Sequence, residues 1–357
     1  MDHRPAPAVR ACPPAEQPSL ERKVQALRQP GCYPLPVQAV RAVETHMSWV
    51  FLTGGHAWKL KKPVRLGRLD FRTVAGRHFY CLEELRLNRR LAPTVYLDVV
   101  PLTLEADGAL RIGGTGIVVD WLVQMQELAS GSLLDSLLAR RAATPAQLQA
   151  VAARLAEFHR AQPRAPLDGR GFRAALLRHI EECARELTDS AWKLPCAPVR
   201  ALFRQQRAWL QQHGPLFDHR VAAGRVVEGH GDLRPEHVWL GQPLAIIDAL
   251  EFSPELRMLD AADEVGFLAL ECERAHAPAL ARELLQAWGA ASGDAVPPEL
   301  LDFYQSCRAC VRASLAIAHL HEERYRATPR WRLRALRYLA LARRHMRRAA
   351  AASPAAR

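Results

Sequence analysis

The sequence lacks the long apolar runs that a membrane protein needs. No stretch approaches the roughly 20 consecutive apolar residues that span a bilayer, so we expect no transmembrane helix. The N-terminal segment MDHRPAPAVRACPPAEQPSL also lacks the apolar core of a secretion signal. Because this segment is rich in proline and alanine, we predict that residues 1–34 form a disordered leader.

Cysteine patterns typical of metal sites are missing as well. The eight cysteines are scattered, and a single CxxC, Cys307 to Cys310, lies in an alanine-rich segment without a second pair. A structural zinc site needs four ligands at characteristic spacings, so we interpret these two residues as packed thiols. Unpaired cysteines without a secretion signal indicate a cytoplasmic protein.

Length and net charge limit the possible domain organisation and the possible partners. The 357 residues suffice for one large domain or two lobes, and a hydrophobic content of 49% is ordinary for a globular protein. The formal net charge of +12 favours acidic small molecules, nucleotides or nucleic acid as partners, without choosing among them.

The pattern of residues 35–122 predicts a small sheet with one inserted helix. Strands are expected at 48–52, 56–61, 96–104 and 111–121. Before the third strand, residues 73–91 have helical periodicity, with Phe79, Leu82 and Leu85 apolar. We predict that these elements form an N-terminal lobe.

From residue 123 to residue 348 the pattern is mostly helical and predicts a larger second lobe. Helices are expected at 133–140, 145–160, 172–187, 199–212, 259–273, 277–290, 298–320 and 330–348. A connector near Trp121 to Met125 would join the lobes, residues 349–357 would form a tail, and a ligand would bind between the lobes. The predicted class is α+β.

One stretch, residues 226–250, combines a hairpin pattern with two acidic positions. Two apolar runs, at 238–240 and 245–247, flank a Gly-Gln-Pro turn and predict a β-hairpin. Asp232 precedes the first strand and Asp248 follows the second. Two carboxylates at one end of a small sheet can bind a divalent metal and leave one of them free to take a proton. An ordinary polar loop before a hairpin is the alternative.

The residues HGDL, followed sixteen positions later by IID, resemble the signature of the aminoglycoside phosphotransferases and their relatives. The segments ETHMSWVFLTGGHAWKLKKPV and CLEELRLNRRLAP are similar to a bacterial branch of that superfamily. The resemblance covers about residues 35–340 and implies a bilobal protein-kinase-like fold. In many members of the branch a P-loop ATPase domain follows. This chain has no GxxxxGKS or GxxxxGKT motif, so that second activity is not expected.

The resemblance implies catalytic and metal-binding roles in the hairpin region. Asp232 matches the carboxylate that orients or deprotonates the acceptor hydroxyl, with His230 beside it as an architectural or proton-carrying residue. Asp248 matches the carboxylate that holds Mg²⁺ against the nucleotide phosphates. The family has an asparagine five residues after the catalytic aspartate, where this chain has His237. Because Mg²⁺ prefers oxygen ligands, His237 implies a site that binds Mg²⁺ through Asp248 and water, prefers another ion such as Mn²⁺, or is catalytically weakened.

The resemblance also implies nucleotide-binding residues in the N-terminal lobe. Lys59 looks like the phosphate-binding lysine, and Glu84 would be its ion-pair partner, with Glu83 as an open alternative. The loop holding Thr45 and Ser48 sits where a phosphate-covering loop belongs. It lacks the glycines of protein kinases, so backbone amides and these two hydroxyls would have to contact the phosphates.

The predicted C-terminal helix, residues 330–348, suggests a second possible function. Arginines recur on one face, at positions 330, 334, 337, 344 and 348, with Leu333, Leu336 and Ala340 on another. This face could contact nucleic acid. With few interleaved aromatic residues, we favour a solvated outer face packed through its leucines.

We therefore predict an ATP- and metal-dependent phosphotransferase that acts on a hydroxyl group of an unidentified small molecule. Met125 and its neighbours would meet the adenine ring through backbone groups. One alternative is a catalytically weak or inactive nucleotide-binding protein with the same fold, for which His237 is the supporting feature. The other is nucleic-acid binding through the arginine-rich helix. The sequence leaves the acceptor and the oligomeric state open.

Overall fold

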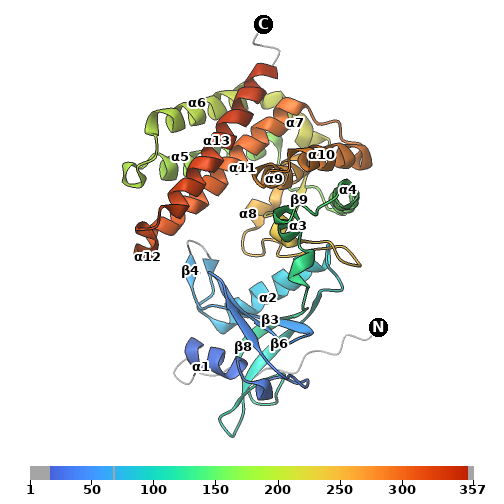
Figure 1. The fold of residues 1–357 in the computed structure, drawn as a ribbon, viewed down its shortest axis with the longest axis vertical. Coiled ribbons are helices and arrows are strands. Elements are labelled where there is room, and N and C mark those ends of the chain that lie inside the picture. Colours follow the sequence, from blue (N-terminus) through green and yellow to red (C-terminus); the bar gives the residue numbers. More distant parts are fainter. Residues whose placement is uncertain (1–16, 67–68, 353–357) are drawn as a thin grey trace. The chain divides into compact units, whose positions relative to one another are not determined.

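The computed structural model describes residues 17–66 and 69–352, so most of the predicted leader and the end of the predicted tail lie outside the described residues. The chain divides into two compact units, labelled by element in Figure 1. Unit 1 comprises Met1–Leu133 and Val238–Ser253, and unit 2 comprises Leu134–His237 and Pro254–Arg357.

Unit 1 is built on a six-stranded antiparallel sheet with the strand order β1-β2-β3-β8-β6-β7. Its strands are β1 (Arg41–Glu44), β2 (Ser48–Leu52), β3 (His56–Lys61), β6 (Tyr96–Leu104), β7 (Leu110–Ile112) and β8 (Ile117–Gln126). The first three predicted strands are confirmed. The predicted strand at 111–121 is wrong, because the glycines at 113, 114 and 116 break it between β7 and β8.

Successive side chains of β3 point alternately to the two faces of the sheet, and these two faces differ. Trp58 and Leu60 are buried in the core on one face, with 1% and 0% of their surfaces exposed. The intervening residues, Ala57, Lys59 and Lys61, point to the other face, because successive strand residues alternate in direction. Ala57 packs there in a second apolar cluster with residues of α2 (Val74–Arg89). The sequence HAWKLK therefore directs two lysines toward α2.

The predicted disordered leader is wrong for part of its length. Residues Leu20–Leu27 form helix α1, which begins where the Ser19 side chain accepts a hydrogen bond from the Arg22 amide. Val24 and Leu27 are buried in the core that contains Trp58. The apolar side chains of α1 cover this face of the sheet, which explains why the segment is ordered despite its flanking prolines.

Helix α2 is confirmed near its predicted limits, but its buried face differs from the prediction. Phe79 and Leu82 are 58% and 46% exposed. The helix instead buries polar side chains at Arg77, Glu84 and Asn88, which repeat at helical spacing on one face. These buried polar groups are tolerated because each has a partner in unit 1.

The expected lobe boundary at residue 122 and the connector at Trp121 to Met125 fall inside β8, where Val123 and Met125 pair with β3.

The short ladders β4–β5 (Arg65–Leu66, Leu69–Asp70) and β10–β11 (Val238–Trp239, Ala245–Ile246) also belong to unit 1. The predicted hairpin at 238–247 is therefore confirmed. Its contacts group it with the N-terminal sheet rather than with the helices that flank it in sequence.

Unit 2 is mostly helical, as predicted. Its helices are α3 (Leu134–Ala139), α4 (Pro145–Ala161), α5 (Gly169–Leu187), α6 (Cys196–Gln212), α7 (Gly214–Ala222), α8 (Pro254–Arg257), α9 (Ala261–Arg274), α10 (Pro278–Ser292), α11 (Pro298–Ala318), α12 (Glu323–Arg326) and α13 (Pro329–Ala352). Strands β9 (Val226–Glu228) and β12 (Met258–Asp260) pair antiparallel. Every residue from 261 to 272 in α9 is buried, so this helix is central to the unit.

Helix α13 packs along α11 through a face that differs from the predicted one. Tyr338, Leu339 and Met346 are among its buried side chains, whereas Leu333 is 50% exposed.

Among the described residues, no helix is both long and apolar enough to cross a membrane. The described cysteines, including Cys307 and Cys310, are free thiols.

Candidate active site

In unit 1 a buried cluster of lysines and carboxylates forms around Glu84. The Lys59 Nζ donates to Glu84 Oε1 at 2.7 Å and to Asp248 Oδ1 at 2.9 Å. Lys61, two residues along β3, donates to Glu84 Oε2 at 2.6 Å and to Glu251 Oε1 at 2.5 Å. One glutamate on α2 is therefore shared by two lysines of β3, and each lysine also holds a carboxylate that follows the β10–β11 hairpin.

The structure distinguishes the two candidate glutamates. Glu84 is fully buried and bonds to Lys59, whereas Glu83 points elsewhere and pairs with Arg86 at 2.9 Å. The two side chains are adjacent in sequence, but neighbouring helical positions point about 100° apart. Only Glu84 therefore faces β3.

Mutual attraction keeps the cluster ionised despite its burial. Burial alone lowers the pKa of Lys59, but Asp248, Glu84 and Glu251 outweigh this effect and raise it well above its usual value. Burial likewise raises the pKa of Glu84, yet the charges of Lys59 and Lys61 bring it below its ordinary value. Lys59 and Glu84 are consequently both charged at neutral pH.

The segment that carries Asp248 is fixed by α2 and β6. Asp248 has a φ of +62°, in the left-handed region that aspartate tolerates better than most residues. Its N–H donates to the Tyr96 hydroxyl at 3.0 Å, and the next N–H, of Ala249, donates to Asn88 Oδ1 at 2.8 Å. Asn88 and Tyr96 were not foreseen from the sequence. The spacing of Glu84 and Asn88, four residues apart on one helical face, is the signal that could have indicated Asn88.

Asp248 is the most accessible member of the cluster. Its side chain is 46% exposed, compared with 15% for Lys59 and 0% for Glu84. Among the described residues, no group of three His, Cys, Asp or Glu side chains could hold a metal by itself. Mg²⁺ is commonly held by one or two carboxylates together with substrate phosphates and water, and the exposed oxygen donors of Asp248 fit that mode.

Hydrogen bonds between Thr45 and Ser48 hold the turn between β1 and β2 together. The Thr45 hydroxyl donates to Ser48 O at 2.9 Å and accepts from the Ser48 amide at 3.0 Å. Ser48 is 2% exposed. These contacts stabilise the turn; Ser48 is buried in it, whereas Thr45 remains exposed.

Met125 is a core residue of β8. It is 9% exposed and packs in the apolar cluster beside α2. Its side chain is therefore not available to a ligand. The strand ends one residue later, at Gln126, where the Glu127 amide donates to Gly55 O at 3.1 Å.

In unit 2 the loop that follows β9 is held by a buried glutamate of α9. Glu264 Oε1 accepts from the amides of His230 and Gly231 at 2.8 Å and 2.7 Å, and its Oε2 lies 2.9 Å from His159 Nε2. Burial raises the pKa of Glu264, but the hydrogen bond with His159, the electrostatic contributions of His159 and His230, and the hydrogen bond from the Gly231 amide lower it to about 2. Glu264 was missed because an acidic residue in a first helical turn is usually explained by the helix dipole.

His230 has an architectural position. It is fully buried, and its Nδ1 accepts the Asp232 amide at 3.3 Å. Gly231 between them has a φ of +87°, which glycine adopts readily. His230 thus shapes the loop that presents Asp232.

Asp232 lies in a network with Arg234 and His237. Arg234 Nε donates to Asp232 Oδ2 at 2.9 Å, while Arg234 also binds Glu236 at 2.5 Å. Burial alone would raise the pKa of Asp232, but the neighbouring His237 ring and the positive charge of Arg234 hold it below its usual value. Asp232 is therefore an ionised carboxylate next to a guanidinium.

Both ring nitrogens of His237 are occupied within this loop. Its Nδ1 lies 2.8 Å from Asp232 O, and its Nε2 lies 3.1 Å from Arg234 Nη2. A carbonyl oxygen can only accept and a guanidinium can only donate, so the neutral ring carries its proton on Nδ1. The remaining lone pair faces Arg234. This arrangement does not fit the predicted metal-binding role of His237, because no ring nitrogen is left free for a metal.

The two sets of residues offer different chemistry. In unit 1, Lys59 and the accessible carboxylate of Asp248 provide a cation and a metal ligand, which together suit phosphate groups. In unit 2, a rigid loop presents the ionised carboxylate of Asp232, which can orient a hydroxyl group or take its proton.

Comparisons with known proteins give the fold and not the substrate. No family model matches the chain. Curated proteins of Mycobacterium tuberculosis and Mycobacterium bovis, both described as uncharacterized proteins, are 33% identical over 310 residues, which is 86% of this chain and 59% of each relative. The chain therefore spans about three fifths of the length of the curated relatives it matches.

Solved structures of kinases resemble this chain in fold. A choline/ethanolamine kinase family protein from Mesorhizobium loti has a TM-score of 0.57 at 15% identity, covering 93% of this chain and 98% of its own. A choline kinase from Cryptosporidium parvum has a TM-score of 0.50 at 11% identity, covering 92% and 94%. At these identities the likeness concerns the fold. The chain thus has the kinase-like fold, with a small antiparallel sheet and a larger helical part, that its resemblance to aminoglycoside phosphotransferases implied.

Proposed function

We propose that this protein is a phosphotransferase that uses ATP and Mg²⁺ to phosphorylate a hydroxyl group of a small molecule. The observation that carries the proposal is Lys59 held between Glu84 and Asp248, because an ammonium group beside an accessible carboxylate can bind phosphate groups and a divalent metal. The kinase-like fold is consistent with it. The fold does not fix the acceptor, which has to be found by experiment.

In this proposal Lys59 binds the phosphates and Glu84 positions it. On nucleotide binding, the Lys59 ammonium would exchange its contact with Asp248 for phosphate oxygens and keep its bond to Glu84. Mg²⁺, when bound, would be held by Asp248 and would neutralise charge on the phosphates. Lys61 would remain paired with Glu84 and Glu251, which keeps the segment of Asp248 attached to β3.

Asp232 would receive the acceptor hydroxyl. Its carboxylate is ionised and can accept the hydroxyl hydrogen bond, and Glu264 keeps the loop in place by binding two of its amides. Arg234 shares this carboxylate, so an acceptor must compete with or reposition the guanidinium. Catalysis would consist of positioning and charge stabilisation rather than covalent chemistry by the protein.

The test is phosphate transfer by the Asp232→Asn variant. ATP is incubated with a mixture of hydroxyl compounds, and new phosphate esters are detected by ³¹P NMR. Loss of a general base typically lowers the rate by about 10²–10⁴-fold, so transfer should fall by that factor while ATP affinity stays unchanged. Asp135→Asn, at an exposed position of α3, is the matched control. Equal transfer by the Asp232→Asn and control variants would refute the assigned role.

A second candidate is a nucleotide-binding protein with little or no transferase activity. The observation that favours it is His237, which stands at the family's asparagine position and whose Nε2 accepts from Arg234. The variant His237→Asn discriminates between the two candidates. A rise in ATP turnover with an unchanged melting temperature would indicate that His237 weakens catalysis, whereas unchanged turnover would count against this second candidate.

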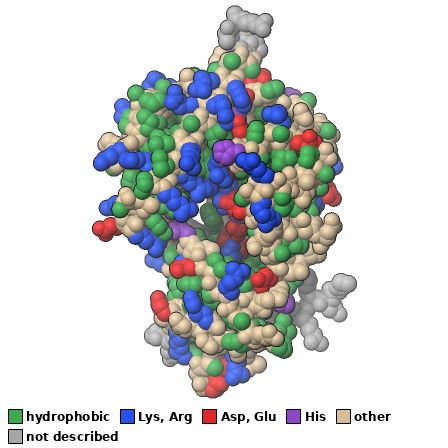
Figure 2. Space-filling view, viewed as in Figure 1, with side chains coloured by type: hydrophobic (Ala, Val, Ile, Leu, Met, Phe, Trp, Pro, Cys, Tyr) green, Lys and Arg blue, Asp and Glu red, His purple; other side chains and the backbone are tan. Residues whose placement is uncertain are grey.

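Nucleic-acid binding through α13 has no specific support. Arg344 is paired with Glu273, and Arg330 and Arg334 lie over the Trp331 ring. On the face drawn in Figure 2, Lys and Arg side chains are interspersed with other types rather than gathered into one continuous patch. We therefore do not propose this function.

A further inference from the structure

Unit 2 contains a small polar cavity beside the start of β9. Its volume is about 220 Å³, and its walls come from the C-terminal ends of α4 and α10, the turn before β9 and the first residue of α9. Three arginines from separate segments line it: Arg160, Arg164 and Arg225. Sites for drug-sized ligands are typically about 300–1,000 Å³, so this cavity suits a smaller molecule.

The charge around this cavity is unbalanced. Its one lining carboxylate, Asp294, is already bound through both oxygens by Arg220, at 2.6 Å and 2.7 Å. Arg225 is 3.8 Å from the same carboxylate. Among the described residues, no carboxylate pairs with Arg160 or Arg164. Arg160 and Arg164 therefore have no lining carboxylate as a counter-charge, and Arg225 shares Asp294 with Arg220.

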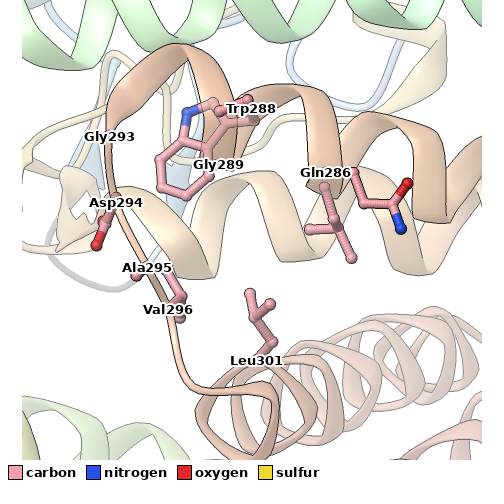
Figure 3. A pocket seen from close by; sticks show the side chains of 10 residues that line it. Gln286, Trp288, Gly289, Gly293, Asp294, Ala295, Val296 and Leu301 are labelled. Carbon is pink, nitrogen blue, oxygen red and sulfur yellow. The ribbon is translucent and has the colours of Figure 1, made fainter.

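A neighbouring cavity has a different lining. It has about twice the volume, 430 Å³, and shares Trp288 and Asp294 with the smaller cavity (Figure 3). None of its ten lining residues is a lysine or arginine, and Leu285, Val296 and Leu301 are among them. Of these two cavities, only the smaller is lined by arginines.

Hydrogen bonds lead from the smaller cavity to the loop that carries Asp232. Trp288 and His159 both line the cavity, and Trp288 Nε1 donates to His159 Nδ1 at 3.3 Å. The other ring nitrogen of His159 lies 2.9 Å from Glu264. Glu264 in turn accepts the amides of His230 and Gly231. A molecule in contact with His159 is therefore two side chains from the loop, and one in contact with Trp288 is three.

We propose that this cavity binds a small molecule bearing a phosphate group, and that binding is transmitted to the loop at 229–232 through Trp288, His159 and Glu264. Guanidinium groups match phosphate oxygens in geometry and charge, and three arginines line this cavity. The binding site stands independently of the proposed phosphotransferase activity, whereas its regulatory consequence rests on that activity.

The binding test is a calorimetric titration of inorganic phosphate into the full chain, with chloride keeping the ionic strength constant. The variant Arg164→Ala/Arg225→Ala should bind phosphate at least tenfold more weakly. Arg160 is left in place because it also donates to Ala291 O at 2.7 Å. The control Arg282→Ala/Arg343→Ala removes the same charge from exposed positions outside the cavity and should bind as the native chain does.

A further variant excludes phosphate binding at the nucleotide site. In Lys59→Met, Glu84 keeps Lys61 as its partner, and phosphate affinity should be unchanged. Phosphate binding that is lost in Lys59→Met, or that is undiminished in Arg164→Ala/Arg225→Ala, would overturn the proposed site.

The transmission test is hydrogen exchange of the loop amides at 229–232, which needs no enzymatic turnover. Phosphate should slow their exchange in the native chain. In Trp288→Phe, which removes the donor to His159 and keeps an aromatic ring, phosphate should still bind but should no longer slow exchange. Unaltered loop exchange on phosphate binding to the native chain would refute the transmission. If phosphate binds as predicted but no transferase activity exists, the proposed function fails and the site remains.

Discussion

Asp120 in β8 joins helices α1 and α2 through a buried ion cluster, and its neutralisation should destabilise unit 1. It is 2% exposed and accepts from Arg77 Nε and Nη2, both at 2.8 Å, and from Lys23 Nζ at 2.8 Å. The substitution Asp120→Asn keeps the size of the side chain but removes its charge. Two cations that are 2% and 4% exposed would then lack a counter-charge.

The expected loss of stability in Asp120→Asn follows from the burial of Lys23 and Arg77. Removing one member of a buried ion pair typically costs about 3–5 kcal/mol, because the remaining charge stays desolvated. The asparagine oxygen retains one acceptor, so we expect the low end of that range, about 3 kcal/mol, out of a total stability of about 5–15 kcal/mol for a typical protein.

Urea unfolding measures this loss of free energy directly. The control Asp107→Asn breaks an ion pair with Arg111 in which both side chains are more than half exposed, and should cost less than about 1 kcal/mol. The reasoning would be refuted if Asp120→Asn cost no more than the control did.

Two further predictions concern unit 2. Burial lowers the pKa of His345, but hydrogen bonds with Asp302 and Glu273 raise it above its usual value of about 6.5. Its stabilising effect should therefore be complete below about pH 6.5 and be lost as the pH rises through the folded-state pKa, and His345→Gln should remove this part of the dependence of melting temperature on pH. In the variant Glu264→Gln, a neutral amide replaces the carboxylate that accepts the His230 N–H. Because this hydrogen bond is weaker, the His230 amide hydrogen should exchange faster than in the native chain.

Much of the sheet could be predicted because local signals were strong. Strands β2 and β3 match their predicted limits, since their apolar alternation is interrupted by a Gly-Gly turn. The split between β7 and β8 was missed although three glycines mark it. Helix α1 was missed because the composition of the whole N-terminal segment outweighed its short amphipathic stretch, in which Val24 and Leu27 face the core.

The candidate site was predicted in part. Lys59 and Glu84 could be found by resemblance, but the choice of Glu84 over Glu83 required the rotation of α2, which sequence does not fix. Lys61 and Glu264 were not foreseen, because charged residues on strands and helices are usually solvated. Their burial depends on partners far away in the sequence: Lys61 pairs with Glu251, and Glu264 binds His159.

The measurement that tests the central claim most directly is calorimetric titration of ATP into the native chain and into Asp248→Ala, each with Mg²⁺, with Mn²⁺ and with neither ion. If Asp248 and Lys59 form a nucleotide site, the native chain should bind ATP in the presence of metal, and the binding should disappear in Asp248→Ala. ATP that fails to bind under any condition, or that binds equally well without metal and without the Asp248 carboxylate, would contradict the claim.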